Sequence, residues 1–420
     1  MTLVRRAALL VVALVGALAA RPAVAAERFG VTSDVGRLEL VVVDRPGDAL
    51  RAVTSANAQA LLFDTPVDVR EAQREHRGLT RTLRANGVEV LDLGDLFGEL
   101  LGADDGARDE VIRETLAHVP AGATRRELAR YLRALSPPAL RQALVAGVRP
   151  TDLPKAARAR VRGVGEFLLP PLPNHIFTRD LGMMMDDRLL LAQPAKEARL
   201  REALHARLVF QRHPRFRELE TVHLGAEHPI EMGDVTMLAP GKALFAYGER
   251  SRFSSAMALA RRQSAEGRDF ELVTYPLPDD NPHMFHGDTI FTPADDDTFN
   301  VHPIVHTLPA TVLTPGKRRG SVVVREEEHL LPAIARAVGR KTIRTIMLPR
   351  GAEADAAQRL DAQNMVAVAP GHVIAYAHND KMNRRLAAAG IQVEPIKGSE
   401  LVRGRGGPHC LTLPLRRAKR

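Results

Sequence analysis

The pattern of apolar and polar residues predicts strands alternating with helices from residue 38 onward. The apolar run 38–43 indicates a buried strand, and the turn-forming residues 44–47 end it. Apolar residues then recur at helical spacing between 64 and 85, and Asn86-Gly87 is typical of a helix end. Residues 88–93 predict the next strand. This alternation predicts an α/β fold.

Two later stretches predict the same unit, which is a strand, a tight turn, a second strand and a helix. The first unit spans 235–263 and turns at Pro240-Gly241, and the second spans 365–389 and turns at Pro370-Gly371. The repetition indicates a modular fold with internal pseudo-symmetry. Between the two units, the pattern predicts a helix over 326–338.

Residues 105–160 differ in character from the rest of the chain. They are rich in Ala, Leu and Arg and are interrupted by prolines at 120, 137, 138 and 150. This predicts three or four short helices. We interpret the segment as a small helical insertion domain, with residues 27–104 and 161–420 forming the α/β domain.

The first residues of the chain resemble an export signal. Arg5 and Arg6 precede the apolar run 7–20, and small residues follow at 23–26. Fourteen residues make a helix of about 21 Å, which is shorter than the roughly 30 Å apolar core of a membrane. The sequence therefore predicts a cleaved signal peptide over residues 1–26. The protein would then be periplasmic or secreted, without stable membrane insertion; the alternative is an uncleaved anchor.

Composition narrows the function further. The 420 residues are 45% hydrophobic, which excludes disorder as the main state. The formal net charge is 59 − 50 = +9, but the basic residues are scattered, aromatics are 4% and Trp is absent, so nucleic-acid binding is disfavoured. One cysteine excludes an intramolecular disulfide. A homo-oligomer is compatible with the sequence.

The single thiol, Cys410, follows the glycine-rich stretch 404–408. A lone cysteine is often a buried small hydrophobe, and that interpretation stays open. Glycines before it would let the backbone approach a ligand closely, and Arg403 and Arg405 would favour a thiolate. Cys410 is therefore a candidate nucleophile that needs an acid or base within reach.

His286 and Asp288 are two residues apart, so an extended backbone would place both on one face. Such a face would offer an acid–base group and an anion to one ligand. Asp180 ends the segment 174–180 after a proline-rich stretch, and Glu231 begins a segment that leads into a strand. Each of these residues is also compatible with a surface turn.

A metal site is the second chemistry that these residue types allow. No H-x-H, H-E-x-x-H or C-x-x-C pattern occurs, which disfavours a metal hydrolase. The candidate ligands are His223, His228, Glu231, His283, His286, Asp288, His302 and His306.

The order and spacing of five stretches resemble the arginine deiminases of the guanidine-group-modifying superfamily. These stretches are 31–64, 173–180, 231–234 with 248–250, 286–289, and 404–410. The resemblance implies a five-bladed, pseudo-symmetric α/β propeller (pentein-like) with the active site in its central channel. It also fits a helical insertion at 105–160.

The resemblance implies hydrolysis of L-arginine to L-citrulline and ammonia through a covalent thiouronium on Cys410. His286 would be the general acid and then the general base, oriented by Glu231. A guanidinium is planar and always charged, so two carboxylates can hold it bidentately. The other implied substrate contacts are Asp180 and Asp288 to the guanidinium, Arg250 and Arg405 to the carboxylate, and Asn174 and Phe177 along the pocket. No metal or cofactor is implied.

The sequence departs from the family where a further carboxylate-binding Arg is expected. Residues 194–199 offer Lys196 or Arg199 in its place. Other guanidino substrates therefore stay open, namely agmatine, methylated arginine or peptidyl arginine, although Arg250 and Arg405 disfavour agmatine, which lacks a carboxylate. Amidino transfer and a non-catalytic arginine-binding protein are the remaining alternatives.

Overall fold

The computed structural model describes residues 29–161, 165–279 and 281–419. The predicted signal peptide over residues 1–26 lies outside these residues. In the part of the chain that is described, no helix has the length and the apolar character needed to cross a membrane.

The described strands form five separate sheets that repeat one pattern. In each sheet a central strand pairs antiparallel with one neighbour and parallel with another. The sheet orders are β17 (Leu413–Arg417), β1 (Leu38–Val43), β2 (Glu89–Asp92); β3 (Gly182–Met185), β4 (Arg188–Leu191), β5 (Glu220–Val222); β6 (Val235–Ala239), β7 (Lys242–Tyr247), β8 (Glu271–Pro276); β9 (Phe291–Pro293), β10 (Thr298–Val301), β13 (Arg344–Ile346); and β14 (Val366–Ala369), β15 (His372–Tyr376), β16 (Gln392–Ile396).

A helix lies in the sequence between each central strand and its parallel partner, because a parallel connection must cross from one end of the sheet to the other. The units predicted at 235–263 and 365–389 are confirmed as β6-β7-α9 and β14-β15-α12. The α/β prediction is likewise confirmed. The crossover helices are α2 (Val69–Ala85), α8 (Glu197–Arg212), α9 (Phe253–Ala265), α10 (Leu330–Ala337) and α12 (Asp380–Ala388), and two shorter helices are α1 (Asp48–Arg51) and α11 (Ala352–Gln358).

The helix predicted over 326–338 is wrong at its start. Residues 322–327 form β12 (Val322–Glu327), which pairs with β11 (Ala310–Pro315) and extends the sheet of β8. Three consecutive valines favour a strand because their branched side chains fit a pleated surface. The helix begins only at Leu330, where apolar residues recur at helical spacing.

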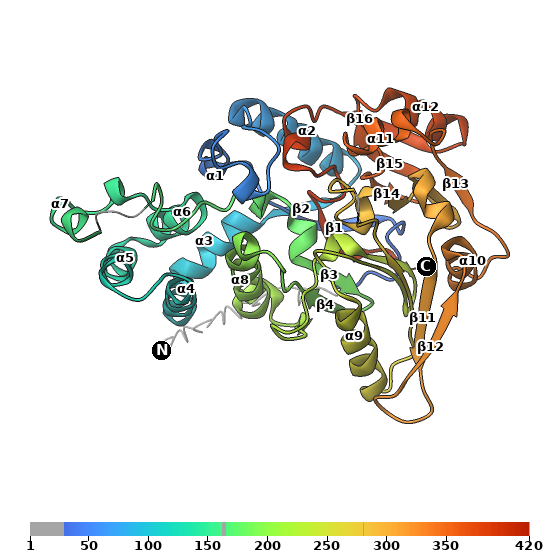
Figure 1. The fold of residues 1–420 in the computed structure, drawn as a ribbon, viewed down its shortest axis with the longest axis horizontal. Coiled ribbons are helices and arrows are strands. Elements are labelled where there is room, and N and C mark those ends of the chain that lie inside the picture. Colours follow the sequence, from blue (N-terminus) through green and yellow to red (C-terminus); the bar gives the residue numbers. More distant parts are fainter. Residues whose placement is uncertain (1–28, 162–164, 280, 420) are drawn as a thin grey trace, which may run out of the picture.

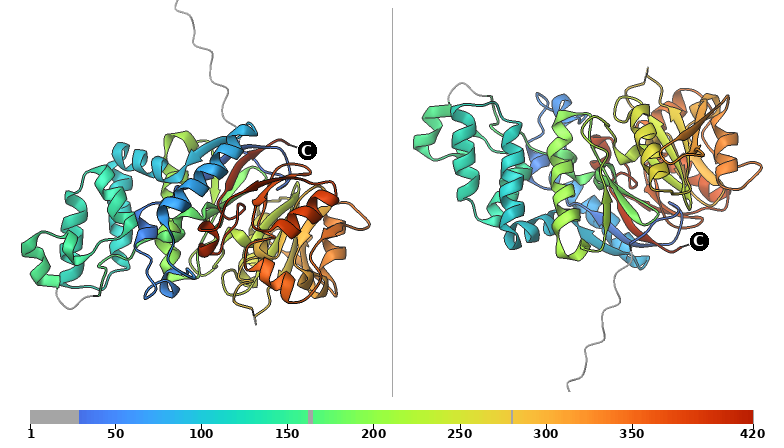
Figure 2. Two further views of the ribbon diagram at one scale, coloured as in Figure 1. Left: turned by 90° about the horizontal axis from the view of Figure 1, so that it is seen from above. Right: turned by 90° about the horizontal axis from the view of Figure 1, so that it is seen from below.

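The helical region begins earlier than residue 105, because α3 (Leu93–Ala103) follows β2 directly. Figures 1 and 2 show these helices gathered at one end of the molecule, away from β10 to β16. They share one hydrophobic core with neighbouring sheets, since Val111 and Leu140 belong to the same buried cluster as Leu190 and Phe245. The remaining helices are α4 (Asp105–Ala117), α5 (Ala123–Ala134), α6 (Pro137–Ala146) and α7 (Lys155–Arg158).

A buried ion pair ties three distant segments together. Nη2 of Arg179 lies 2.9 Å from Oδ2 of Asp34 and donates to the carbonyl of Val235 at 2.7 Å. Asp34 also accepts from the backbone N–H of Met237 at 3.1 Å. Burial alone would raise the pKa of Asp34, but Arg179 holds it below its ordinary value. The pair therefore fixes the segment before β1 and the start of β6 to the segment before β3.

Replacement of Asp34 by Asn should lower the free energy of unfolding by about 3 kcal/mol at pH 7, because it leaves a buried guanidinium without its anion. The unfolded carboxyl titrates near 3.8, and the folded pKa is lower. The additional stability of the native protein over the Asn variant is therefore complete above the unfolded-state pKa of 3.8. It is lost as the pH falls through the folded-state pKa. Denaturant unfolding at pH 7 and pH 3 measures both effects.

The matched control is Asp380→Asn, which removes one charge from the exposed pair with Arg384 on α12. This change should leave the unfolding curve nearly unchanged. Equal losses in the two variants would contradict a structural role for the Asp34–Arg179 pair.

Candidate active site

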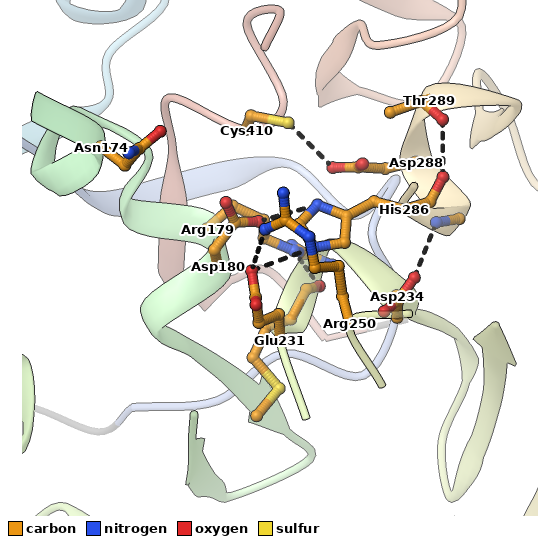
Figure 3. A network of polar contacts seen from close by, with 12 residues as sticks. Asn174, Arg179, Asp180, Glu231, Asp234, Arg250, His286, Asp288, Thr289 and Cys410 are labelled. Carbon is orange, nitrogen blue, oxygen red and sulfur yellow. Dashed lines mark hydrogen bonds and ion pairs between the residues drawn. The ribbon is translucent and has the colours of Figure 1, made fainter. Parts of the chain in front are cut away.

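In four of the five described sheets, a polar side chain of one buried cluster precedes the outer strand that pairs antiparallel with the central strand. Asp180 precedes β3, Glu231 precedes β6, Asp288 precedes β9, and Cys410 precedes β17. The repeated entry into the sheets thus brings together residues that are far apart in the sequence. Figure 3 shows these side chains turned toward one another around His286.

His286 lies between two carboxylates and is fully buried. Its Nε2 lies 3.2 Å from Oε2 of Glu231, and its Nδ1 lies 3.5 Å from Oδ1 of Asp180. Burial favours the neutral ring, but Asp180, Asp234 and Glu231 outweigh it and raise the pKa of His286 to about 9. The imidazole is therefore protonated at neutral pH and can act as a general acid.

Close approach of these groups depends on Gly233. A Cβ at this position would lie 2.7 Å from Nδ1 of His286 and 2.8 Å from Oδ1 of Asp180. Such separations are below van der Waals contact, so any larger residue would push the imidazole away from the carboxylate.

Two buried arginines balance the carboxylates. Nη1 of Arg199 lies 2.6 Å from Oδ2 of Asp180 and 2.8 Å from Oε2 of Glu231, and its Nε donates to Glu202 at 3.0 Å. Nη1 of Arg250 lies 3.2 Å from the same oxygen of Glu231. Burial would raise the pKa of Glu231, but Arg250 and Arg199 keep it well below its ordinary value. Glu231 is therefore an anion that can stabilise the imidazolium.

The thiol lies on the other side of the cluster, beside Asp288. Sγ of Cys410 donates to Oδ2 of Asp288 at 3.4 Å, and Nδ1 of His409 lies 2.7 Å from the same oxygen. Burial would raise the pKa of Asp288, yet the contact with His409 holds it below its ordinary value. Burial and the charges of Asp288 and Asp180 raise the pKa of the Cys410 thiol well above its ordinary value. A cation placed between the carboxylates would reverse that effect.

Asn174 and Phe177 both lie at the edge of the cluster. Nδ2 of Asn174 donates to the carbonyl of Leu61 at 2.8 Å, which connects the loop before β3 to the loop after α1. The Phe177 ring is buried against the glycine-rich loop. A Cβ at Gly404 or Gly406 would lie 2.7 or 2.4 Å from that ring, so the loop requires glycine at both positions.

Two predicted substrate contacts lie outside the cluster. Arg405 adopts a left-handed backbone conformation with φ of 63° and pairs with Asp64, and its side chain is 29% exposed. Nζ of Lys196 lies 3.0 Å from Oε2 of Glu249, and its side chain is 35% exposed. Of the two candidates for the additional carboxylate-binding residue, Arg199 lies in the buried cluster and Lys196 lies near its rim.

The candidate metal ligands named from the sequence do not come together as one site in the described residues. Among the described residues, one potential three-ligand group forms, with donor atoms of Asp180, Glu231 and His286 within 4.8 Å of one another. Nη1 of Arg199 already contacts both carboxylates, so a cationic side chain satisfies this group. His302, another candidate ligand, pairs instead with Asp355 at 3.1 Å.

Sequence reasoning missed Asn364, which contacts Cys410 directly. Nδ2 of Asn364 donates to Sγ at 3.1 Å. The repeat was the available signal, because Asn364 precedes β14 as the other cluster residues precede their sheets. The pairing of His409 with Asp288 was also missed, because it joins two loops that precede strands of separate sheets.

The repeated α/β units, together with a buried cysteine, histidine and carboxylates at the strand entrances, define a pentein-type enzyme. The N-terminal domain of ArgZ, an arginine dihydrolase of cyanobacteria, is similar in fold, with a TM-score of 0.54 and 14% identity over 90% of this chain and 98% of that chain. A DDAH of Pseudomonas aeruginosa, solved with citrulline, gives a TM-score of 0.51 and 13% identity over 90% of this chain and 99% of that chain.

Sequence comparison identifies the family, which the structural similarities do not. The family model for arginine deiminase matches residues 59–417. The chain is 38% identical to the arginine deiminase of Rhodococcus opacus over 93% of this chain and 97% of the relative. The chain is 37% identical to the arginine deiminase of Mycobacterium tuberculosis over 93% of this chain and 98% of that relative. The chain belongs to the arginine deiminase family, and the predicted enzyme class is confirmed.

The charge near His286 allows a test by pH. Oδ1 of Asp234 accepts from the N–H of Gly287 at 2.9 Å, and burial raises the pKa of Asp234 to about 7. Above that pH Asp234 is an anion that helps His286 hold its proton. Asp234→Asn should therefore lower the pKa of His286 and move the alkaline fall of kcat/KM down by about one pH unit.

The control for this change is Asp269→Asn, which removes an exposed carboxylate in the loop before β8. Profiles of kcat/KM between pH 5 and 10 for both variants and the native enzyme make the comparison. An alkaline limb that does not move in Asp234→Asn would show that His286 does not titrate in that limb.

Proposed function

We propose that the enzyme hydrolyses L-arginine to L-citrulline and ammonia through a covalent intermediate on Cys410. The observation that carries the proposal is the convergence of a thiol, an imidazolium and three carboxylates in one buried cluster. The family supports the reaction type. The arrangement supports the substrate, because the charges in the cluster suit a cation that is planar and permanently charged.

The carboxylates Asp180 and Asp288 hold the guanidinium nitrogens of the substrate. The interaction of Asp180 with the guanidinium of Arg199 supports this role, since it has the same chemistry. The bound cation lowers the pKa of the neighbouring thiol, which burial and the two carboxylates otherwise raise. Binding of the substrate thus prepares the thiolate that attacks it.

The thiolate of Cys410 forms a C–S bond with the guanidinium carbon. His286 donates its proton to the departing nitrogen, and the C–N bond breaks. Ammonia departs, and a thiouronium group stays bound to the sulfur. Neutral His286 then takes a proton from water as its oxygen attacks the same carbon. The C–S bond breaks and citrulline leaves. One arginine and one water therefore give one citrulline and one ammonia.

The substrate carboxylate is the second recognition element. Arg250 lies in the cluster with its guanidinium 5.0 Å above the ring of Phe285, and Arg199 lies beside it on Glu231. We propose that Arg199 and Arg250, with Arg405 from the glycine-rich loop, bind the carboxylate. Lys196 supplies a weaker point charge at the rim, because an ammonium lacks the bidentate fork of a guanidinium.

We also propose that the five sheets are the blades of a propeller around this cluster. Support comes from the repeated strand order in every described sheet and from the position of Asp180, Glu231, Asp288, Asn364 and Cys410 before the antiparallel outer strands. In this arrangement the short segments before β3, β6, β9, β14 and β17 line the central channel.

The direct test is release of citrulline and ammonium from L-arginine by the purified full chain. We expect equal amounts of the two products, and loss of both in Cys410→Ser, whose hydroxyl is a far weaker nucleophile. Agmatine, which lacks the carboxylate, should be turned over at least about a hundredfold more slowly. A folded protein with a reactive thiol that does not convert arginine would move the assignment to another guanidino substrate.

We further propose that residues 1–26 direct export and are removed. Expression of the full chain in a bacterium should yield a mature protein that begins at Glu27 in the periplasm or medium, as read by N-terminal sequencing. Leu14→Arg, which places a charge in the apolar run, should retain the uncleaved chain inside the cell. An uncleaved native chain in the cytosolic fraction would contradict export.

A further inference from the structure

The sheet of β14, β15 and β16 contributes to the cluster a residue that has no role in the proposed reaction. Asp180, Glu231, Asp288 and Cys410 each precede the antiparallel outer strand of a sheet, and Asn364 stands in the same place before β14. Its side chain is fully buried. A buried amide requires partners for both of its ends, so its contacts identify what it holds.

Both ends of the Asn364 amide contact the loop that carries the thiol. Nδ2 donates to Sγ of Cys410 at 3.1 Å and to the carbonyl of Asp288 at 3.1 Å. Oδ1 accepts from the backbone N–H of Gly407 and of Cys410, each at 3.0 Å. One neutral side chain therefore holds the reacting atom and the backbone that positions it.

The segment before β14 is itself fixed by buried side chains of a neighbouring sheet. Nδ2 of Asn300 in β10 donates to the carbonyl of Ala362 at 2.8 Å, and the Thr292 hydroxyl in β9 donates to that of Gln363. The thiol loop packs directly against this segment, because a Cβ at Gly407 would lie 2.3 Å from the carbonyl oxygen of Asn364. The amide is thus held in one orientation before substrate binds.

We propose that Asn364 is a further catalytic residue, whose amide N–H stabilises the thiolate of Cys410. The thiol lies beside carboxylates that oppose its ionisation, and within the described residues the donor to Sγ is Asn364. A neutral donor stabilises the thiolate without competing with the substrate cation for the carboxylates. The same N–H stabilises the sulfur again when the C–S bond of the intermediate breaks. This inference rests on the proposed role of Cys410 as nucleophile.

The test measures the pKa of the thiol by the rate of alkylation with iodoacetamide between pH 6 and 11. Cys410 is the one cysteine of the chain, so the reaction reports on it alone. Asn364→Asp keeps an oxygen for the N–H groups of Gly407 and Cys410 but replaces the donor with an anion. We expect the thiol pKa to rise by at least about one pH unit, which lowers the alkylation rate at a fixed pH below both pKa values about tenfold.

Asn383→Asp on α12 is the matched control, since Asn383 donates from Nδ2 to the carbonyl of Tyr376 and does not contact the thiol loop. It should reproduce the native alkylation profile. A second variant, Asn364→Ser, introduces no charge and has a side chain too short to reach Sγ, so it should shift the profile in the same direction by a smaller amount. It also serves if Asn364→Asp does not fold, as judged by near-ultraviolet circular dichroism.

Native-like alkylation profiles in folded Asn364→Asp or Asn364→Ser would overturn the inference and leave Asn364 with a structural role alone. Absorbance of the thiolate at 240 nm, with Cys410→Ser subtracted, checks the pKa without depending on reagent access. Neither readout requires turnover. If the thiol pKa shifts in these variants but the native protein does not convert arginine, the proposed function is wrong. The inference that Asn364 stabilises the thiolate would still hold.

Discussion

The active-site arrangement depends on the ion pairs that Arg199 makes with Asp180 and Glu231 inside the protein. Two carboxylates at this depth would repel each other and take up protons if they lacked a counter-charge. Nη1 of Arg199 lies within 2.8 Å of both carboxylates, and its Nε pairs with Glu202 at 3.0 Å. The guanidinium therefore fixes the separation of the two carboxylates and, with Arg250, holds the pKa of Glu231 well below its ordinary value. The protonated state of His286 follows from that fixed negative charge.

The fold supplies the positions that this charge network requires. Buried ion pairs contribute little net stability, because desolvation offsets their attraction, so the network serves geometry more than folding. The hydrophobic clusters around the sheets and the repeated hairpins hold the strand entrances in place. The Asp34–Arg179 pair joins distant segments of the chain, whereas the cluster around His286 has the proposed role of acting on the substrate.

Sequence patterns predicted the repeat where its turns were explicit and missed it where strands were short. Pro240-Gly241 and Pro370-Gly371 identified two of the hairpins, whereas β9 and β13 have three residues each and lack such a signal. The resemblance named residues such as Cys410 by motif, but which arginine lies in the cluster depends on three-dimensional contacts. Asn364 was missed because only its position in the repeat indicated it, whereas its contact with the thiol depends on packing against the loop of Cys410.

The order of strands in the first sheet links activity to completion of the chain. β1 comes first in the sequence, yet its antiparallel partner is β17, which directly follows the segment that carries Cys410. A polypeptide that stops before β17 leaves β1 without its antiparallel partner, and one that stops before residue 410 also lacks the proposed nucleophile. The proposed catalysis therefore requires synthesis of the chain through residue 417, since Cys410 and the strand that completes the first sheet are made together.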